Sequence, residues 1–321
     1  MKLLSKTFIF DQTPPTPSCH ASTLAKIGDT VIAAWFGGTY ESHPDVQIWC
    51  AYLENGIWST PVCVSEKENV AHWNPVLFDN GEELLLFYKR GETIPDWQTM
   101  VTSSRDKGRT WSVPRRMCAD DTCGRSSVLG GGTILGRGPV KNKPIRLKNG
   151  DILAPASMEK GCWRCFTDLS RDNGKTWEMG PLVPLPDDGV QIIQPSLWED
   201  SDGIHMLMRS KNKAVYRADS ADGLHFDTAY PTAVPNNNSG LDLIQSAPGH
   251  LILCCNPVDT AARTPLSLLE STDGGRTFET VLHLETEPGE YSYPAIIADG
   301  NRICGTYTWR REKIVYFEAL L

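Results

Sequence analysis

The sequence lacks the features of a membrane protein and of a nucleic-acid-binding protein. No segment approaches the roughly 18 consecutive apolar residues that a membrane-spanning helix needs. Basic residues form no run and the formal net charge is −8, so we expect no nucleic-acid partner and no anionic membrane surface. The N-terminal apolar stretch is interrupted at Ser5, Lys6 and Thr7 and ends at Asp11, which is too short for a secretory signal. We therefore expect a cytoplasmic protein.

The sequence also lacks a recognisable metal or cofactor site. The ten cysteines are scattered, with one Cys-x-x-Cys pair at Cys162 and Cys165 and one vicinal pair at Cys254 and Cys255. A zinc site would require a second pair or suitably spaced histidines. There is no nucleotide-binding motif and no Ser-His-Asp constellation. We expect reduced, buried thiols and no cofactor or metal.

Long helical periodicity is missing as well, and short strands joined by tight turns take its place. The chain of 321 residues contains 27 Gly, 22 Pro and 10 Trp, which favours many short strands. Its content of hydrophobic residues (40%) and charged residues (22%) is typical of a globular protein with a buried core.

A glycine-containing tight turn followed by an apolar strand recurs six times. The turns contain Gly28, Gly81, Gly150, Gly203, Gly249 and Gly300. Successive glycines lie 53, 69, 53, 46 and 51 residues apart, which is the length of a four-stranded propeller blade. The sequence therefore predicts an all-β fold, a single six-bladed β-propeller over residues 1–321. We expect Lys6–Phe10 to form a strand that closes the last blade beside the C-terminal strands, because a ring left open would expose strand edges.

A second repeat interleaves with the first. The pattern Ser-x-Asp-x-Gly-x-Thr-Trp occurs at Ser104–Trp111 and Ser170–Trp177, with Phe for Trp at Ser271–Phe278. A shortened copy spans Ser220–Phe226, and Asn55–Trp58 is a degenerate one. With these repeats, the chain resembles the sialidase superfamily of Asp-box (BNR-repeat) proteins over almost its whole length. We interpret the boxes as structural, because Ser and Asp side chains can bind turn amides while the aromatic residue packs between blades.

Polar and aromatic residues gather at one end of the predicted blades. Suppose that all six glycine turns lie at one end of the ring, which we call the bottom. The strand before each turn then begins at the opposite end, the top, and the strand after the turn ends at the top. The top then collects His20, Lys89, Asn142, Lys143, Glu159, Gln194, Arg209, Asp242, Tyr291, Tyr293 and Arg310. We expect the substrate-binding residues among Arg209, Arg263, Lys89, Asn142, Lys143, Gln194, Asp242, Tyr293 and Arg310. Because positively charged side chains gather there in a net-negative protein, we expect an anionic ligand. The resemblance to sialidases implies that this ligand is a carbohydrate.

The resemblance implies particular roles for residues that bind a substrate carboxylate. Sialidases hold this carboxylate with three arginines, and Arg209 and Arg263 match two of the positions. His20 stands at the third. Imidazole, with a pKa near 6.5, is mostly neutral at pH 7, so His20 does not supply the third fixed charge.

The resemblance also implies a catalytic set. Tyr291, in the segment Glu290-Tyr291-Ser292-Tyr293-Pro294, matches the sialidase nucleophile. Gln194 matches the glutamate that would take the proton from the tyrosine, and an amide cannot do so. Asp45 best matches the acid/base aspartate, on a loop that also carries Glu41. An aspartate placed before a strand can equally be a turn cap. We expect Tyr291, Asp45, Glu41 and His20 to be the catalytic candidates.

Three functions remain compatible with these residues. The first is an exo-acting glycoside hydrolase on an acidic sugar or a related glycan end. The second is a uronate-directed lyase, in which Tyr291 and His20 would remove the proton next to a carboxylate that cations neutralise. The third is a sugar-binding propeller without catalysis. Their products differ: a reducing sugar, an unsaturated uronate that absorbs in the near ultraviolet, or none.

Overall fold

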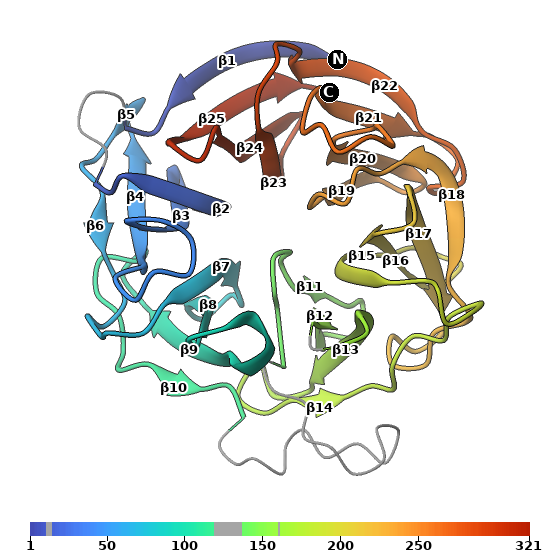
Figure 1. Cartoon of the computed structure of the whole chain (residues 1–321), viewed down its shortest axis with the longest axis horizontal. Helices are drawn as coiled ribbons and strands as arrows, with labels where there is room; N and C mark the ends of the chain where they lie inside the picture. Colours follow the sequence, from blue (N-terminus) through green and yellow to red (C-terminus); the bar gives the residue numbers. More distant parts are fainter. Residues whose placement is uncertain (11–14, 119–136, 160) are drawn as a thin grey trace.

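The chain folds into a ring of antiparallel sheets, and the predicted six-bladed β-propeller is confirmed (Figure 1). The computed structural model describes residues 1–10, 15–118, 137–159 and 161–321. The described strands form six sheets, and in each of them neighbouring strands run antiparallel. No helix within these ranges is long and apolar enough to cross a membrane.

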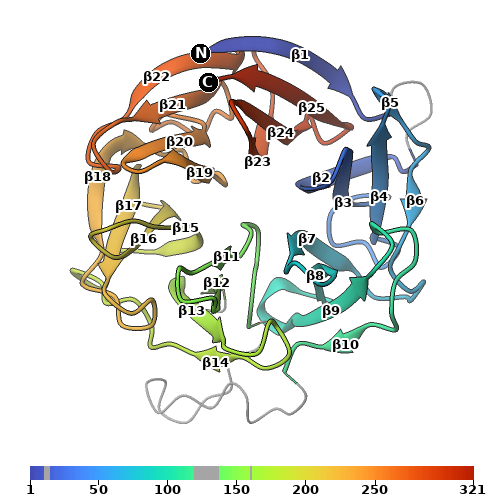
Figure 2. The same cartoon turned by 180° about the vertical axis from the view of Figure 1, so that it is seen from behind.

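Each blade runs from an inner strand at the centre of the ring to an outer strand at its rim (Figures 1 and 2). Blade 1 contains β2 (Ser18–Ile27), β3 (Thr30–Gly38), β4 (Gln47–Glu54), β5 (Ile57–Trp58) and β6 (Val62–Cys63). Blade 2 contains β7 (His72–Asp79), β8 (Leu84–Arg90), the 3-10 turn η1 (Ile94–Asp96), β9 (Gln98–Ser104) and β10 (Arg115–Arg116). Blade 3 contains β11 (Ile145–Arg146), β12 (Ile152–Met158), β13 (Arg164–Ser170) and β14 (Glu178–Met179). Blade 4 contains β15 (Ile192–Glu199), β16 (Ile204–Ser210), β17 (Ala214–Ser220) and β18 (Tyr230–Pro235). Blade 5 contains β19 (Asp242–Ala247), β20 (His250–Cys255), β21 (Leu266–Ser271) and β22 (Glu279–Glu285). Blade 6 contains β23 (Tyr291–Asp299), β24 (Arg302–Trp309), β25 (Lys313–Leu320) and β1 (Lys2–Phe8).

The N-terminal strand closes blade 6, with a boundary that differs from the sequence prediction. β1 pairs antiparallel with β25 and forms the outer strand of the blade, and the two chain ends lie close together in Figures 1 and 2. The strand spans Lys2–Phe8 rather than Lys6–Phe10. After the strand, the Ile9 amide still donates to the Ile314 carbonyl (2.9 Å), and the buried ring of Phe10 lies 5.1 Å from that of Trp35.

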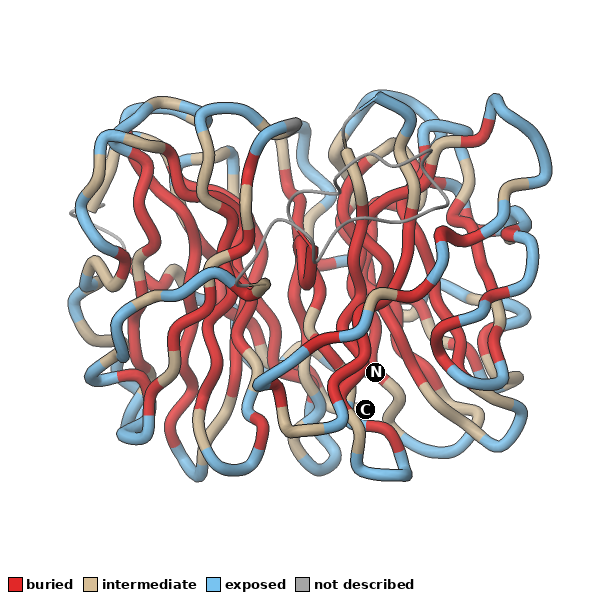
Figure 3. The backbone as a smooth tube through the Cα atoms, turned by 90° about the horizontal axis from the view of Figure 1, so that it is seen from below, coloured by how far each residue is buried: buried red, intermediate tan, exposed pale blue. Residues whose placement is uncertain are grey.

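The core lies between the blades, and the turns at both ends of the ring are exposed (Figure 3). The Asp boxes bind their own turns as expected. In the first of them, Ser104 Oγ accepts a hydrogen bond from the amide of Gly108 (2.8 Å), and Asp106 Oδ1 accepts one from the amide of Thr110 (2.8 Å). Trp177 of the second box packs against Phe87 of the neighbouring blade, with ring centroids 6.0 Å apart.

Four inner strands share a β-bulge near the end at which they begin. The register shifts in β2, β7, β15 and β23, and each bulge holds one residue with a left-handed backbone. These are Ala21 (φ 55°), Asn74 (φ 41°), Gln194 (φ 54°) and Tyr293 (φ 54°). Such backbone conformations are costly for residues other than glycine and persist where surrounding contacts hold them. The bulges interrupt the alternation of side chains along the strand.

A charged cluster links the strands of blade 4 around His205. Its ring nitrogens lie 2.6 Å from Asp219 Oδ1 and 3.0 Å from Asp200 Oδ1. Arg217 Nε donates to the same Asp219 oxygen (2.8 Å), and the His205 ring stacks on Trp198 at 4.8 Å. Burial alone would lower the pKa of His205, but the hydrogen bonds to Asp219 and Asp200 outweigh burial and raise it above its usual value. The folded protein thus favours the imidazolium form of His205 more than water does.

The contribution of His205 to stability should therefore depend on pH. A histidine with a raised pKa stabilises the fold fully below its unfolded pKa, near 6.5, and this contribution is lost as pH rises through the folded value. We expect His205→Gln to lower the free energy of unfolding more at pH 6 than at pH 9, as measured by urea denaturation. His225→Gln is the matched control, because His225 pairs with Asp222 at the surface. If His205→Gln lowers the free energy of unfolding equally at both pH values, the pKa of His205 is not raised in the folded protein.

Candidate functional site

The structure brings Tyr293 together with three of the predicted site residues. The Tyr293 hydroxyl oxygen accepts a hydrogen bond from Arg209 Nη1 (2.8 Å) and another from Gln194 Nε2 (3.3 Å). The ring of Tyr293 lies 4.2 Å from the imidazole of His20, centroid to centroid. All four side chains are buried, and Tyr293 is 9% exposed. They come from three blades, because inner strands of different blades meet at the centre of the ring (Figure 1).

Tyr291, the nucleophile expected from the sequence, lies in a different environment. Its side chain is 1% exposed and belongs to an apolar cluster that includes Ile244 and Ile296. Its hydroxyl lies 3.4 Å from Arg310 Nη2. The bulge that follows Ser292 takes Tyr293 out of the strand register, so the two tyrosines do not share one face of β23 as simple alternation would require. Tyr293 is therefore the tyrosine of the polar cluster.

Two predicted substrate-binding residues, Arg209 and Arg263, lie near the Tyr293 ring. Their guanidinium carbons lie 5.8 Å and 5.9 Å from its centroid. Arg209 is further held by Asn238, whose Oδ1 accepts a hydrogen bond from Nε (2.9 Å). Arg263 pairs with Glu290 (2.6 Å). Positive charge is thus concentrated around a phenol group, which favours binding of an anion there.

A chain of ion pairs joins segments between strands in blades 1, 5 and 6. Glu290 accepts from Arg263 and from Arg311 Nε (2.8 Å), and Arg311 also pairs with Glu41. The carboxylate of Glu41, a predicted catalytic candidate, is therefore engaged by a guanidinium. Since all members are only partly buried, a ligand carboxylate can compete with Glu41 and Glu290 for these guanidinium groups.

His20 is a neutral imidazole with one ring nitrogen available. Nδ1 lies 3.0 Å from Thr308 Oγ1, and within the described part of the chain Nε2 has no hydrogen-bond partner. Burial lowers the pKa of His20 well below its usual value, and the charges of Arg311, Arg263, Arg209 and Lys141 lower it further. A buried nitrogen without a partner is unusual in a folded protein, and it is suited to contact a ligand or water.

Glu159 is a site residue that the sequence analysis placed at this end without assigning it a role. Its Oε1 lies 3.4 Å from Gln194 Nε2, the nitrogen that also contacts Tyr293. Burial raises the pKa of Glu159, and Arg209, Lys89 and Gln194 only partly offset this effect. A carboxyl group with a raised pKa is suited to hold and donate a proton near neutral pH.

Asp45, the expected acid/base residue, acts as a turn cap. It accepts hydrogen bonds from the amide (2.9 Å) and the hydroxyl (2.6 Å) of Thr39, and it lies 2.7 Å from His43 Nδ1. Burial tends to raise the pKa of Asp45, but these hydrogen bonds outweigh it and the pKa lies below its usual value. The geometry favours the structural alternative for this residue, because a proton donor needs a raised pKa.

Several predicted substrate-binding residues bind the protein itself. Lys89 is fully buried, donates to Thr99 Oγ1 (2.7 Å) and to the carbonyl groups of Arg137 and Gly138 (3.2 and 3.3 Å), and burial lowers its pKa to about 7. Lys143 pairs with Asp242 (2.9 Å).

Three further predicted substrate-binding residues, Asp242, Asn142 and Arg310, also contact other groups of the protein. Asp242 accepts additional hydrogen bonds from Ser196 Oγ and the Ile296 amide. Asn142 donates to backbone carbonyl groups, as described below. Arg310 is exposed, and its guanidinium carbon lies 4.7 Å from the ring of Trp309.

A signal for the bulge was present in the sequence. In three of the four bulges the left-handed residue precedes a proline, in Asn74-Pro75, Gln194-Pro195 and Tyr293-Pro294. The repetition of this pair at the start of inner strands could have indicated that Tyr293 and Gln194 occupy equivalent positions in their blades.

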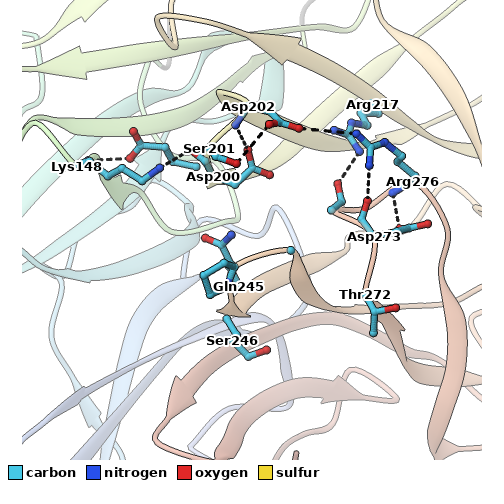
Figure 4. A pocket seen from close by; sticks show the side chains of 15 residues that line it. Lys148, Asp200, Ser201, Asp202, Arg217, Gln245, Ser246, Thr272, Asp273 and Arg276 are labelled. Carbon is cyan, nitrogen blue, oxygen red and sulfur yellow. Dashed lines mark hydrogen bonds and ion pairs between the residues drawn. The ribbon is translucent and has the colours of Figure 1, made fainter.

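A pocket lies at the other ends of the strands of blades 4 and 5, away from the Tyr293 cluster (Figure 4). It has a volume of about 590 Å3 and is lined by the turn between β15 and β16, the turn between β19 and β20, and the third Asp box. Many of its charged groups bind neighbouring groups of the wall. Lys148 Nζ binds the carbonyl of Asp200, and Arg217 Nη1 binds that of Gly274 (2.9 Å). In the part of the chain that the structure describes, no group of three or more His, Cys, Asp or Glu side chains could hold a metal ion.

The fold is shared with sialidases of low sequence identity. A protein of unknown function from Dyadobacter fermentans superposes with a TM-score of 0.80 at 15% identity, covering 100% of this chain and 99% of that one. The Hadza microbial sialidase Hz136 gives a TM-score of 0.75 at 13% identity, covering 95% of this chain and 66% of its own. Trypanosoma rangeli sialidase in complex with the inhibitor DANA gives 0.73 at 12% identity, with 94% and 55% covered. The chain thus spans about half to two thirds of the length of these two sialidases.

The repeats assign the sequence to a protein family. No curated protein matches it at a significant level. The family model described as the BNR repeat-like domain matches residues 29–306, which is most of the propeller. With this match, the Asp boxes and the six blades, the chain belongs to the BNR repeat-like domain family and has a sialidase-like propeller fold.

Proposed function

We propose that this protein is a sialidase-like exo-glycoside hydrolase that acts on the acidic end of a glycan, with Tyr293 as its nucleophile. The observation that carries the proposal is the pair of hydrogen bonds from Arg209 and Gln194 to the Tyr293 hydroxyl oxygen. Both donors stabilise negative charge on that oxygen, which is the charge that a phenol must develop to attack a sugar carbon. Gln194 need not accept the proton for this stabilisation to operate.

The surrounding charges suit an anionic sugar. The guanidinium carbons of Arg209 and Arg263 lie at nearly equal distances from the centre of the tyrosine ring, and among the charged residues Arg311 lowers the pKa of His20 most. Arg311 can thus supply the third cation that His20 does not. A tyrosine nucleophile is neutral before it reacts, so it does not repel a carboxylate next to the reacting carbon.

Glu159 is the proton donor that the proposal requires. Its pKa is raised by burial, and it contacts the same Gln194 nitrogen as Tyr293. Tyr293 would lose its phenol proton to solvent water as its oxygen bonds to the sugar carbon, and a protonated Glu159 would protonate the departing oxygen; the Tyr293 oxygen takes a proton back from solvent when the sugar is released. Water then releases the sugar, and the Glu159 carboxylate can accept the proton from that water.

A lyase is the second candidate, and the free Nε2 of His20 favours it. This neutral nitrogen lies beside Tyr293 and within the field of several arginines. In a uronate, the arginines would neutralise the carboxylate, His20 would remove the adjacent proton, and Tyr293 would protonate the leaving oxygen. The product would carry a new carbon–carbon double bond.

A panel of substrates separates the two candidates. We would incubate the protein with fluorogenic sialosides and glucuronides and with uronate-containing oligosaccharides, and follow released fluorophore, reducing ends and near-ultraviolet absorbance. The hydrolase yields fluorophore or reducing ends without new absorbance, and the lyase yields absorbance. If neither signal appears with any substrate while the same glycans bind, the protein is a binding module.

Arg263→Ala should weaken binding of the anionic substrate. A charge-assisted hydrogen bond contributes about 1.5–3 kcal/mol, so we expect KM or Kd to rise about tenfold or more. Arg171→Ala is the matched control, because Arg171 is exposed, pairs with Glu178 and lies in an Asp box. An unchanged KM for Arg263→Ala would argue against recognition of a carboxylate at this end of the ring.

A further inference from the structure

The side chains of Lys141 and Asn142, in the segment before β11 of blade 3, reach the backbone of other blades. Lys141 Nζ donates to the carbonyl of Leu241 in the segment before β19 (2.8 Å), to that of Pro294 in blade 6, and to Asn142 Oδ1 (2.8 Å). Asn142 Nδ2 donates to the carbonyl groups of Gln194 and Pro195 in blade 4, both at 3.0 Å. The two side chains are 3% and 1% exposed. Their donors are therefore directed at backbone carbonyl groups.

Three of these four carbonyl groups belong to the two bulges that contain Gln194 and Tyr293. Asn142 binds the carbonyl of Gln194 itself and that of Pro195, and Lys141 binds the carbonyl of Pro294, the residue after Tyr293. Gln194 and Tyr293 both have φ of 54°. A left-handed backbone at such residues persists only when the surroundings hold it in place.

Lys141 and the Tyr293 ring also border the same glycine. A methyl group built at Gly240 would lie 3.1 Å from Lys141 Cε and 3.4 Å from Tyr293 Cδ2. The hydrogen bond to the Pro294 carbonyl and this shared border at Gly240 both place Lys141 close to the bulge of β23.

We propose that Lys141 and Asn142 are positioning residues, which hold the bulges of β15 and β23 so that Gln194 and Tyr293 meet. The expected effect on turnover rests on the proposed function, whereas the expected effect on the backbone of the two bulges does not. A positioning role replaces the expectation that Asn142 binds substrate. Two side chains from one short segment thereby align residues that lie about 100 positions apart in the sequence.

Asn142→Ala, with Asn80→Ala as a matched control, tests this role. Asn80 is also buried and also makes three hydrogen bonds, to the Asn173 carbonyl and from the amides of Glu82 and Glu83. It lies at the turn between β7 and β8, at the other end of the strands. We would measure hydrogen exchange by mass spectrometry in both variants after confirming folding by circular dichroism.

Asn142→Ala should raise amide exchange about tenfold or more in peptides that contain Ser196 and those that contain Tyr293 to Ile296. Asn80→Ala should leave those peptides unchanged. On a substrate found in the panel, Asn142→Ala should lower kcat about tenfold or more with KM within about twofold, as expected when alignment rather than binding is lost. Asn142→Asp keeps the acceptor for Lys141 but cannot donate, so it should show the same pattern if the alanine variant does not fold.

Unchanged exchange in both peptides, or a raised KM with unchanged kcat, would overturn the proposal. The second result would return Asn142 to substrate binding. If the panel contains no substrate, the proposed hydrolase or lyase function fails, and the exchange comparison still decides whether Asn142 holds the bulges.

Discussion

Tyr293→Phe should lower turnover by about 100-fold or more, or roughly 3 kcal/mol in the barrier. The substitution removes only the hydroxyl group, whose oxygen accepts the hydrogen bonds from Arg209 and Gln194. The ring remains beside His20, so the melting temperature should change little. The measurement is kcat on the best substrate of the panel, with KM recorded separately.

Tyr291→Phe is the control for this prediction. It removes the same group from a buried tyrosine two positions earlier, where the hydroxyl lies 3.4 Å from Arg310. We expect it to keep most of its activity. If Tyr291→Phe loses turnover and Tyr293→Phe does not, the sequence alignment with the sialidase nucleophile is correct, and the chemistry involves Tyr291.

Asp168→Ala should lower the free energy of unfolding by about 3–5 kcal/mol. Asp168 is fully buried in β13, where it accepts hydrogen bonds from Arg137 Nε (2.9 Å) and from the amide of Gly138 (2.7 Å). Burial raises the pKa of Asp168 despite these partners and the charge of Lys89, so the ion pair does not fully repay its desolvation. Removing the carboxylate takes away the acceptor of the Arg137 guanidinium in a buried ion pair, and the loss of one member of such a pair is the source of the large effect.

Urea denaturation of Asp168→Ala and of Glu178→Ala measures the difference between a buried and an exposed pair. Glu178 pairs with Arg171 at the surface, with side chains 54% and 57% exposed, and its loss should cost less than about 1 kcal/mol. A double variant, Asp168→Leu with Arg137→Met, should recover much of the lost stability, because it removes both members of the buried ion pair. Losses of equal size in the two single variants would contradict this account.

The blade count, the strand order and the structural role of the Asp boxes follow from the sequence alone. Each depends on residues close together in the chain: Gly81 and its equivalents form the hairpins, and Ser104 and Asp106 bind amides within their own turn. Local chemistry repeated at a regular spacing can be read without knowledge of distant contacts. The gathering of the candidate residues at one end of the ring is also a prediction of the sequence, because antiparallel strands alternate in direction.

The identity of the central tyrosine was decided by the tertiary structure. Alternation along β23 treats Tyr291 and Tyr293 as equivalent, but the bulge after Ser292 separates them. The carbonyl that follows Tyr293 is bound by Lys141, which lies 153 residues away from Pro294 in the chain. Likewise, Glu159 and Tyr293 share a contact with Gln194 Nε2, and Gln194 is the left-handed residue of the bulge in β15. Strand periodicity is a local property, whereas the bulges are held by hydrogen bonds between blades, and these contacts exist only after the blades have packed together.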